Sequence, residues 1–163
     1  MSVLKMRTKS IIYPVFMLIF ILIVHACSIN ECPDGNYIIF GQSYGECLGT
    51  DCVKVFKLSE TGLYFDTRAI ERQPDNREFK QLPESEFIKA KDLWDLFPSQ
   101  LLSMPETTFG CPDCRDQGAI ILEFSVGNKS LRFSIDQDKN EIPKFLHGYV
   151  NKINDIIMLI EVK

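Results

Sequence analysis

The densest run of apolar residues lies at the N-terminus of the chain. Three basic residues, Lys5, Arg7 and Lys9, precede an almost uninterrupted apolar stretch over residues 11–24. A basic segment followed by a short apolar segment is typical of a secretory signal peptide. As a helix the stretch would cover about 21 Å, whereas the hydrocarbon core of a bilayer is about 30 Å thick. The segment is therefore short for a permanent membrane span.

The apolar stretch ends in Val24-His25-Ala26-Cys27, which resembles the signal of a bacterial lipoprotein. The resemblance implies that residues 1–26 are removed by cleavage after Ala26 and that Cys27 carries a thioether-linked lipid. Two alternatives are an uncleaved N-terminal anchor and ordinary cleavage that leaves Cys27 free. Lipidation is favoured because stable anchoring needs more than one acyl chain, which a multiply acylated cysteine supplies without a spanning helix.

Strand-like patterns begin after a short polar tether, residues 27–36, which contains Cys32. Residues 37–163 form the remaining single domain. Apolar runs at 37–40, 53–58 and 63–65 predict three strands, and a glycine-containing loop of hairpin length joins the last two. We expect these strands to form an antiparallel meander.

A polar region, residues 67–84, predicts a turn at 73–76 and a short edge strand at 77–82. An amphipathic helix is expected over residues 85–97, and Pro98 should end it. Its apolar face contains five residues: Phe87, Ala90, Leu93, Trp94 and Phe97. Trp94 is interpreted as a core residue rather than as a platform for a ligand.

A second strand pair is predicted at 119–126 and 131–135, and the alternation of apolar and polar residues in the second of these suits a sheet with one buried face. A final helix follows, with Asn140 as its expected N-cap and Pro143 in its first turn. Its apolar stripe consists of Ile142, Phe145, Leu146, Tyr149, Val150, Ile153, Ile156 and Ile157.

The order of these elements has no regular alternation of strand and helix. It predicts an α+β fold, in which an antiparallel sheet of about five strands carries two helices packed on one face, after a cleaved signal peptide.

The charge balance argues against a nucleic-acid partner. The chain has 18 Lys+Arg, of which three lie in the signal peptide, so 15 remain against 22 Asp+Glu and the net charge becomes −7. A nucleic-acid-binding protein needs clustered positive charge to displace counterions from phosphates.

Four cysteines form two close pairs in the sequence, Cys47 with Cys52 and Cys111 with Cys114. In an exported protein such pairs indicate disulfides. Local pairing would stabilise the fold by about 2 kcal/mol per bond and cross-pairing by about 4 kcal/mol. The turn-forming residues between the partners favour local pairing, which leaves Cys32 free or available for an intermolecular bond.

Two other uses of the four cysteines remain open. Four thiolates could hold zinc tetrahedrally, although a C-x4-C arm is not the commonest spacing. Alternatively, Cys111 and Cys114 could form a redox-active C-x-x-C motif, although the sequence after them predicts a strand instead of the helix that usually lowers the pKa of the first thiol.

Other side chains offer weaker candidates. Glu46, Asp51, Asp113 and Asp116 flank the cysteine pairs and could offer oxygens to calcium, but turn formation is the favoured interpretation. His147 has no activated serine or cysteine partner in the sequence and is interpreted as a surface or helix-flank residue. We find no hydrolase, metalloprotease or nucleotide-binding motif, so we expect neither enzymatic activity nor a cofactor.

Three segments together resemble small lipoproteins of unknown function found in Bacteroidota. They are FGQSYGEC at 40–47, CVKVFKL at 52–58 and GCPDCRDQG at 110–118. The resemblance implies attachment to the cell envelope, in the outer membrane, facing the periplasm or the cell surface, and supplies no catalytic or binding residue.

The leading hypothesis is a non-enzymatic, membrane-anchored module that binds an envelope protein or small ligand, or serves a structural role. The alternative is a thiol redox or zinc-handling lipoprotein that uses Cys47, Cys52, Cys111 and Cys114.

Overall fold

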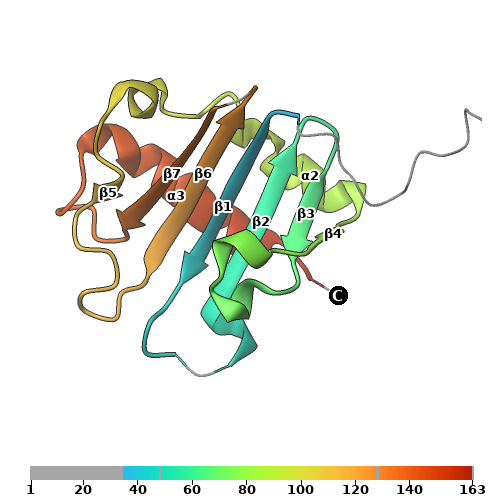
Figure 1. Ribbon diagram of the computed structural model, residues 1–163, viewed down its shortest axis with the longest axis horizontal. Coiled ribbons are helices and arrows are strands. Elements are labelled where there is room, and N and C mark those ends of the chain that lie inside the picture. The colour runs from blue at the N-terminus through green and yellow to red at the C-terminus, as the bar shows by residue number, and fades with distance from the viewer. Residues whose placement is uncertain (1–34, 48, 128, 163) are drawn as a thin grey trace, which may run out of the picture. The chain divides into compact units, whose positions relative to one another are not determined.

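Seven strands form one open sheet in the order β4-β3-β2-β1-β6-β7-β5 (Figure 1). This computed structural model describes residues 35–47, 49–127 and 129–162. The predicted signal peptide, Cys27, Cys32 and most of the tether lie outside these residues. The strands are β1 (Tyr37–Ser43), β2 (Val53–Ser59), β3 (Leu63–Asp66), β4 (Phe79–Gln81), β5 (Thr108–Phe109), β6 (Ala119–Val126) and β7 (Lys129–Asp136).

Two α-helices accompany the sheet in the described part of the chain, α2 (Glu84–Ala90) and α3 (Lys144–Leu159). Short 3₁₀ helices occupy Thr50–Cys52, Ala69–Glu71, Pro74–Asn76, Lys91–Leu93 and Ser99–Ser103. In Figure 1, α2 and α3 lie behind the sheet, and the chain around residues 69–76 lies in front of β1, β2 and β3. The predicted α+β class is therefore confirmed, but the expected number of about five strands was too low, because the short edge strands β4 and β5 bring the sheet to seven.

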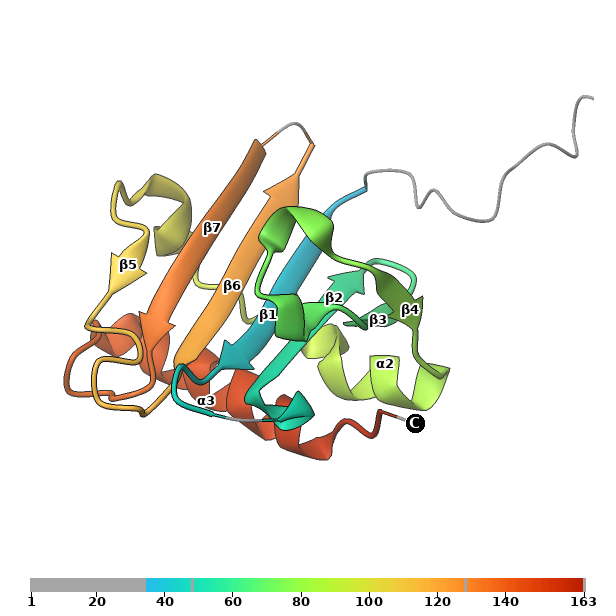
Figure 2. The same cartoon turned by 60° about the horizontal axis from the view of Figure 1, so that its bottom comes forward.

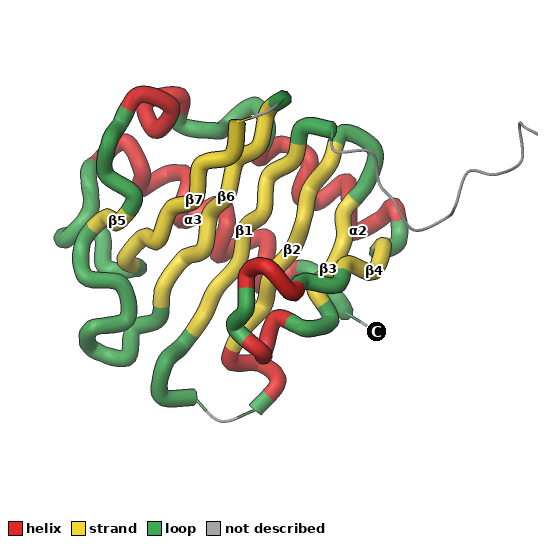
Figure 3. The backbone as a smooth tube through the Cα atoms, viewed as in Figure 1, coloured by secondary structure: helices red, strands yellow, loops and turns green. Residues whose placement is uncertain are grey.

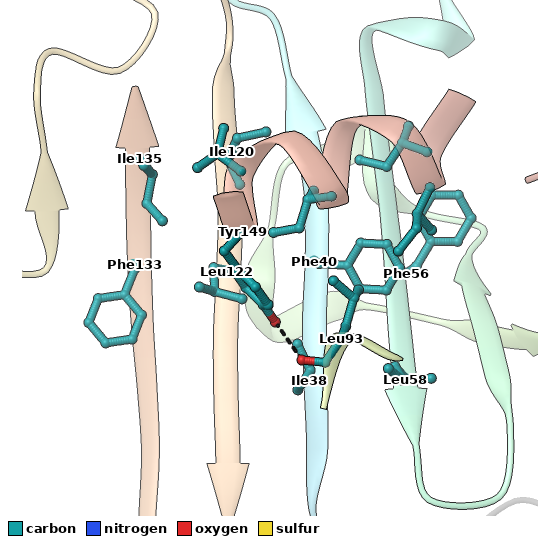
Figure 4. Packing of buried hydrophobic residues seen from close by; sticks show 14 of the residues in the cluster. Ile38, Phe40, Phe56, Leu58, Leu93, Ile120, Leu122, Phe133, Ile135 and Tyr149 are labelled. Carbon is teal, nitrogen blue, oxygen red and sulfur yellow. Dashed lines mark hydrogen bonds between the residues drawn. The ribbon is translucent and has the colours of Figure 1, made fainter. Parts of the chain in front are cut away.

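The main core fills the space between the sheet and the two helices. It consists of alternate residues of the central strands together with apolar residues of α2, of α3 and of the 3₁₀ turns that follow α2. Figure 4 shows part of this core, with Leu93 and Tyr149 beside residues of the strands. Phe40 and Phe56 stack on neighbouring strands with ring centroids 5.5 Å apart, and both are fully buried. Tyr149 of α3 donates a hydrogen bond to the carbonyl oxygen of Leu93 at 3.3 Å, so its buried hydroxyl group is satisfied.

A smaller apolar cluster lies on the opposite face of the sheet. Its buried members are Ile39, Cys52, Val53, Val55 and Ala69. Ala69 belongs to the 3₁₀ segment that crosses this face, as the red tube in front of the yellow strands of Figure 3 shows. The centre of the sheet is therefore covered on both faces.

The predicted meander is confirmed, because β1 pairs with β2 and β2 with β3, all antiparallel. The predicted edge strand at 77–82 contains β4, which pairs with β3. The predicted strand pair at 119–126 and 131–135 forms β6 and β7.

The structure adds features of the sheet that local patterns did not predict. β6 pairs with β1, so the first strand lies in the middle of the sheet. β1 also continues through Gly41 to Ser43, where the apolar pattern stops. Gly41 is required there, because a Cβ atom would collide with the carbonyl oxygen of Lys54. The two-residue strand β5 is parallel to β7, the one parallel pairing among the described strands.

The prediction of one α-helix over residues 85–97 was partly wrong. The α-helix ends at Ala90, and a 3₁₀ turn, Lys91–Leu93, follows it. A spacing of three residues separates Phe87, Ala90 and Leu93, which suits the three-residue turn of a 3₁₀ helix as well as an α-helix. Trp94 packs against the main core, as expected.

The prediction that Asn140 caps the last helix was wrong. Helix α3 begins at Lys144, and Pro143 is its N-cap residue. Asn140 is used elsewhere, since its backbone and side-chain N–H groups both donate to the Asp138 carboxylate at 2.9 Å. This tight turn keeps residues 138–142 out of the helix.

Candidate functional site

Both cysteine pairs lie at one end of the sheet, which we call the disulfide end. It consists of the loop 44–52, between β1 and β2, and the loop 110–118, before β6. Ser43, the last residue of β1, pairs with Val53 on one side and with Ala119 on the other. The two loops therefore emerge side by side, at the lower end of the sheet in Figure 1.

Cys47 and Cys52 form a disulfide with their Cα atoms 5.4 Å apart. Cys52 is only 2% exposed and belongs to the apolar cluster with Val53 and Val55. The carbonyl oxygen of Cys52 accepts a hydrogen bond from the backbone N–H of Tyr44 at 2.9 Å. This disulfide is consequently part of the packed interior.

Cys111 and Cys114 form the second disulfide, with their Cα atoms 5.5 Å apart. Both residues are exposed. The N–H of Cys114 donates to the carbonyl oxygen of Cys111 at 3.1 Å, which closes a tight turn around Pro112 and Asp113. Both bonds are the local pairs that the residues between the cysteines favoured.

The buried carboxylate of Asp136, at the end of β7, holds the loop 110–118. It accepts hydrogen bonds from the N–H of Cys111 at 2.9 Å, the side-chain amide of Gln117 at 3.0 Å and the N–H of Asp138 at 2.8 Å. Burial raises the pKa of Asp136, but these hydrogen bonds and the nearby charge of Arg115 outweigh it, so the pKa is lowered overall. Asp136 is therefore held as an anion.

Asp113 joins the two disulfide loops. Its carboxylate accepts a hydrogen bond from the N–H of Gly45 in the first loop at 2.5 Å and another from the N–H of Gly118 in its own loop at 2.9 Å. Asp113 has a positive φ of 60°, a conformation that aspartate tolerates better than most residues. The sequence indicated a turn at Asp113, but it contained no signal for the contact with Gly45.

A cavity of about 180 Å³ adjoins the exposed disulfide. The residues that line it are Cys111, Cys114, Arg115, Gln117, Asp136, Asp138 and Glu141. The carboxylate of Asp136 already accepts hydrogen bonds from the loop, whereas the Cys111–Cys114 bond is accessible from solvent. The chemistry that this arrangement can offer is thiol–disulfide exchange at an accessible bond.

Three of the other candidate residues, Asp51, Asp113 and His147, have structural partners. Asp51 forms an ion pair with Lys54 at 3.2 Å, and Asp113 joins the loops, so two of the four proposed calcium ligands are already engaged. His147 lies on α3, with Nε2 3.1 Å from the carbonyl oxygen of Ile142. In residues 35–47, 49–127 and 129–162, no group of three or more His, Cys, Asp or Glu side chains is arranged to hold a metal ion.

No family model matches the chain, and no curated protein is similar to it. Within the residues that the structure describes, no helix is long and apolar enough to cross a membrane.

Proposed function

We propose that the chain is a lipid-anchored protein of the bacterial cell envelope, and that its folded domain is a non-enzymatic module that binds an envelope protein or a small ligand. The observation that carries the proposal is the pairing of Cys47 with Cys52 and of Cys111 with Cys114. Structural disulfides persist in oxidising compartments such as the periplasm and the cell surface, and are rare in the cytosol.

The N-terminal sequence supports the same compartment. A basic, then apolar segment ending in Val24-His25-Ala26-Cys27 is what export and lipidation of Cys27 require. The similarity of residues 40–47, 52–58 and 110–118 to small Bacteroidota lipoproteins is a third argument, and it points to the outer membrane. Cleavage after Ala26 would leave a short tether before β1.

The direction of β1 favours the disulfide end as the part of the domain that contacts a partner. The chain enters the domain at Tyr37, where Asn36 donates to Glu60 at 3.2 Å and accepts from the N–H of Gly127 at 3.2 Å. β1 then runs for about 20 Å to Ser43, where the disulfide loops begin. With the anchor at Cys27, the disulfide end is the part of the domain farthest along β1 from the point of attachment.

Mass spectrometry and cell fractionation of the expressed protein test the anchor. We expect a mature N-terminus at Cys27 that carries acyl chains, and recovery of the protein with membranes. Cys27→Ser should release the protein from the membrane fraction, whereas the matched variant Cys32→Ser should not. An unmodified Cys27, or a full-length product with Met1 in the cytosol, would contradict the proposal.

Thiol counting on the same protein tests the compartment. We expect Cys47, Cys52, Cys111 and Cys114 to resist alkylation in cells until a reductant is added. Four free thiols before reduction, or stoichiometric zinc in the purified protein, would favour the alternative function of metal handling.

A second function, thiol–disulfide exchange, is favoured by the exposure of Cys111 and Cys114 beside a cavity. In this reaction a partner dithiol would attack the bond, become a disulfide, and leave Cys111 and Cys114 as thiols. In the reverse direction, the Cys111 thiolate of the variant Cys114→Ala would attack the disulfide of an oxidised partner and release one partner sulfur as a thiolate. Because Cys114 is no longer present to resolve this bond, a mixed disulfide with the partner should accumulate. Cys52→Ala provides the matched control, because Cys47 is not beside this cavity, and equal trapping by both variants would argue against the function.

A further inference from the structure

A second cavity lies on the face of the sheet opposite α2 and α3. It measures about 180 Å³ and lies between the strands and the segment 69–77, which crosses in front of β1 and β2 in Figure 2. Val53, Val55 and Ile121 line its apolar floor. Val55 and Ile121 lie on the strands on either side of β1, where both pair with Gly41.

The cavity also has charged walls, formed by Asp66, Arg72 and Arg77. The charges of Asp66 and Arg77 compensate each other, since Arg77 Nε lies 3.8 Å from the Asp66 carboxylate. Arg77 Nη1 also donates to Glu123 at 3.1 Å, and Asp66 accepts backbone N–H groups as well. Asp66, Arg77 and Glu123 therefore form a paired network in which buried charge is satisfied.

Arg72 is the third charged residue, and it has no carboxylate partner among the described residues. The one hydrogen bond of its guanidinium group goes from Nη2 to the carbonyl oxygen of Tyr44 at 2.6 Å. Arg72 also adopts a left-handed conformation, with φ 53° and ψ 25°. This conformation is uncommon for a residue other than glycine, and such conformations concentrate at functional sites.

Two further polar side chains line the cavity near Arg72. The Ser43 hydroxyl and the Gln73 amide make no hydrogen bond to another described residue, so both are available as donors. The cavity therefore combines an apolar floor with one uncompensated positive charge and neutral donors. A few polar groups above an apolar surface are typical of small-molecule sites.

We propose that this cavity binds a small organic carboxylate with a short aliphatic chain. The carboxylate would accept charge-assisted hydrogen bonds from Arg72, because a guanidinium group matches a carboxylate in geometry and charge. The aliphatic chain would lie on Val55 and Ile121. The volume is below the roughly 300–1,000 Å³ of sites for drug-sized ligands, which limits the ligand to a small molecule.

Titration of the full chain, purified in a non-ionic detergent, with acetate, butyrate and hexanoate tests the proposal. Binding can be followed by calorimetry at constant ionic strength. We expect saturable binding whose affinity rises by about fourfold for each methylene that the floor covers. Hexylammonium and inorganic phosphate should bind more weakly than hexanoate, because the first has the wrong charge and the second has no chain. Equal binding of these ligands, or no saturable binding of hexanoate, would overturn the proposal.

Arg72→Asn separates binding from folding, because asparagine tolerates the left-handed conformation better than arginine. We expect hexanoate affinity to fall by about tenfold or more while the thermal midpoint of unfolding stays within a few degrees of the original. The matched control is Arg68→Gln, since Arg68 lies beside the same 3₁₀ turn but is engaged by Glu71 at 2.9 Å and does not line the cavity. Unchanged hexanoate affinity in Arg72→Asn, or an equal loss in Arg68→Gln, would show that Arg72 is not the carboxylate site.

Discussion

The two disulfide loops differ in what holds them, although both are short and lie at the same end of the sheet. In the loop 44–52, Cys52 is 2% exposed and packs among valines of β2. In the loop 110–118, both cysteines are exposed, and the buried carboxylate of Asp136 supports the backbone. The first bond belongs to an apolar cluster, whereas the second rests on a polar network.

This difference separates stability from reactivity. Both bonds close small rings, for which the chain-entropy model gives about 2 kcal/mol each. Burial adds packing energy to the first bond and restricts access to it, while exposure leaves the second open to an attacking thiolate. We therefore expect Cys47–Cys52 to act mainly as a structural bond and Cys111–Cys114 to be the more readily reduced one.

Selective reduction should give the largest effect. In the folded protein, dithiothreitol should reduce Cys111–Cys114 roughly 100-fold faster than Cys47–Cys52, because the buried bond must first be exposed by local opening at a cost of about 3 kcal/mol. Timed alkylation followed by peptide mass spectrometry measures both rates. Equal rates would mean that burial of Cys52 does not protect its bond.

Removal of each bond should then show unequal losses of stability. We expect the double variant Cys47→Ala/Cys52→Ala to lose about 3 kcal/mol of unfolding free energy, since packing is lost in addition to the ring closure. The matched variant Cys111→Ala/Cys114→Ala should lose about 2 kcal/mol. Urea unfolding monitored by circular dichroism gives both values. A larger loss from the second variant would reverse the comparison.

Asp136→Asn should weaken the polar support of the exposed loop by about 2 kcal/mol, because an amide cannot accept from all three of its N–H donors. Asp138→Asn in the neighbouring turn is the control and should cost less than about 0.5 kcal/mol, because the Asp138 side chain makes no contact with Asp136 and an asparagine oxygen can still accept from Asn140. Urea unfolding would again measure the effect, and hydrogen exchange at Cys111 should accelerate only in the first variant. Equal behaviour of the two variants would show that the buried carboxylate is dispensable.

The smallest effect should appear in the dependence of stability on pH. The folded-state pKa of Asp136 is below its unfolded value of about 3.9. The contribution of Asp136 to the free energy of unfolding is therefore complete above that unfolded pKa, and it is lost as pH falls through the lower folded pKa. Unfolding free energy measured from pH 5 to acid should fall less steeply in Asp136→Asn than in the original chain, and parallel curves would contradict this assignment.

The pH profile needs a second variant, because Glu123 also has a lowered pKa. Burial raises the pKa of Glu123, but the ion pairs with Arg132 and Arg77 lower it by a larger amount, so the pKa is lowered overall. Like Asp136, ionised Glu123 therefore stabilises the fold, and this stabilisation is lost as the pH falls. Glu123→Gln should therefore keep the part of the acid dependence that belongs to Asp136.

Much of the fold could be predicted because its elements carry local patterns. Alternation at Val53–Ser59 and within Lys129–Asp136 marks strands with one strongly apolar face. The three-residue spacing from Phe87 to Leu93 located a helical segment, but it could not distinguish an α-helix from a 3₁₀ turn. The end of β1 was missed because Gly41 and two polar residues interrupt the apolar run.

Less of the candidate site could be predicted. The sequence identified Cys111 and Cys114, but the role of Asp136 depends on β7 ending beside their loop. The cavity at Arg72 depends on a 3₁₀ segment that crosses two strands distant from it in sequence. Contacts of this kind have no signature in a single sequence, since the partners are far apart along the chain.

By itself, the sequence determined the periodic elements, the acidic balance and the closeness of each cysteine pair, because each depends on residues that are near one another in the chain. Only the tertiary structure decided that β6 lies beside β1, that Asp113 joins the two loops and that one disulfide is buried while the other is exposed. Burial is a property of the packed whole, since it depends on which distant segments cover a residue. Two cysteine pairs with similar spacing can therefore occupy environments that favour different chemistry.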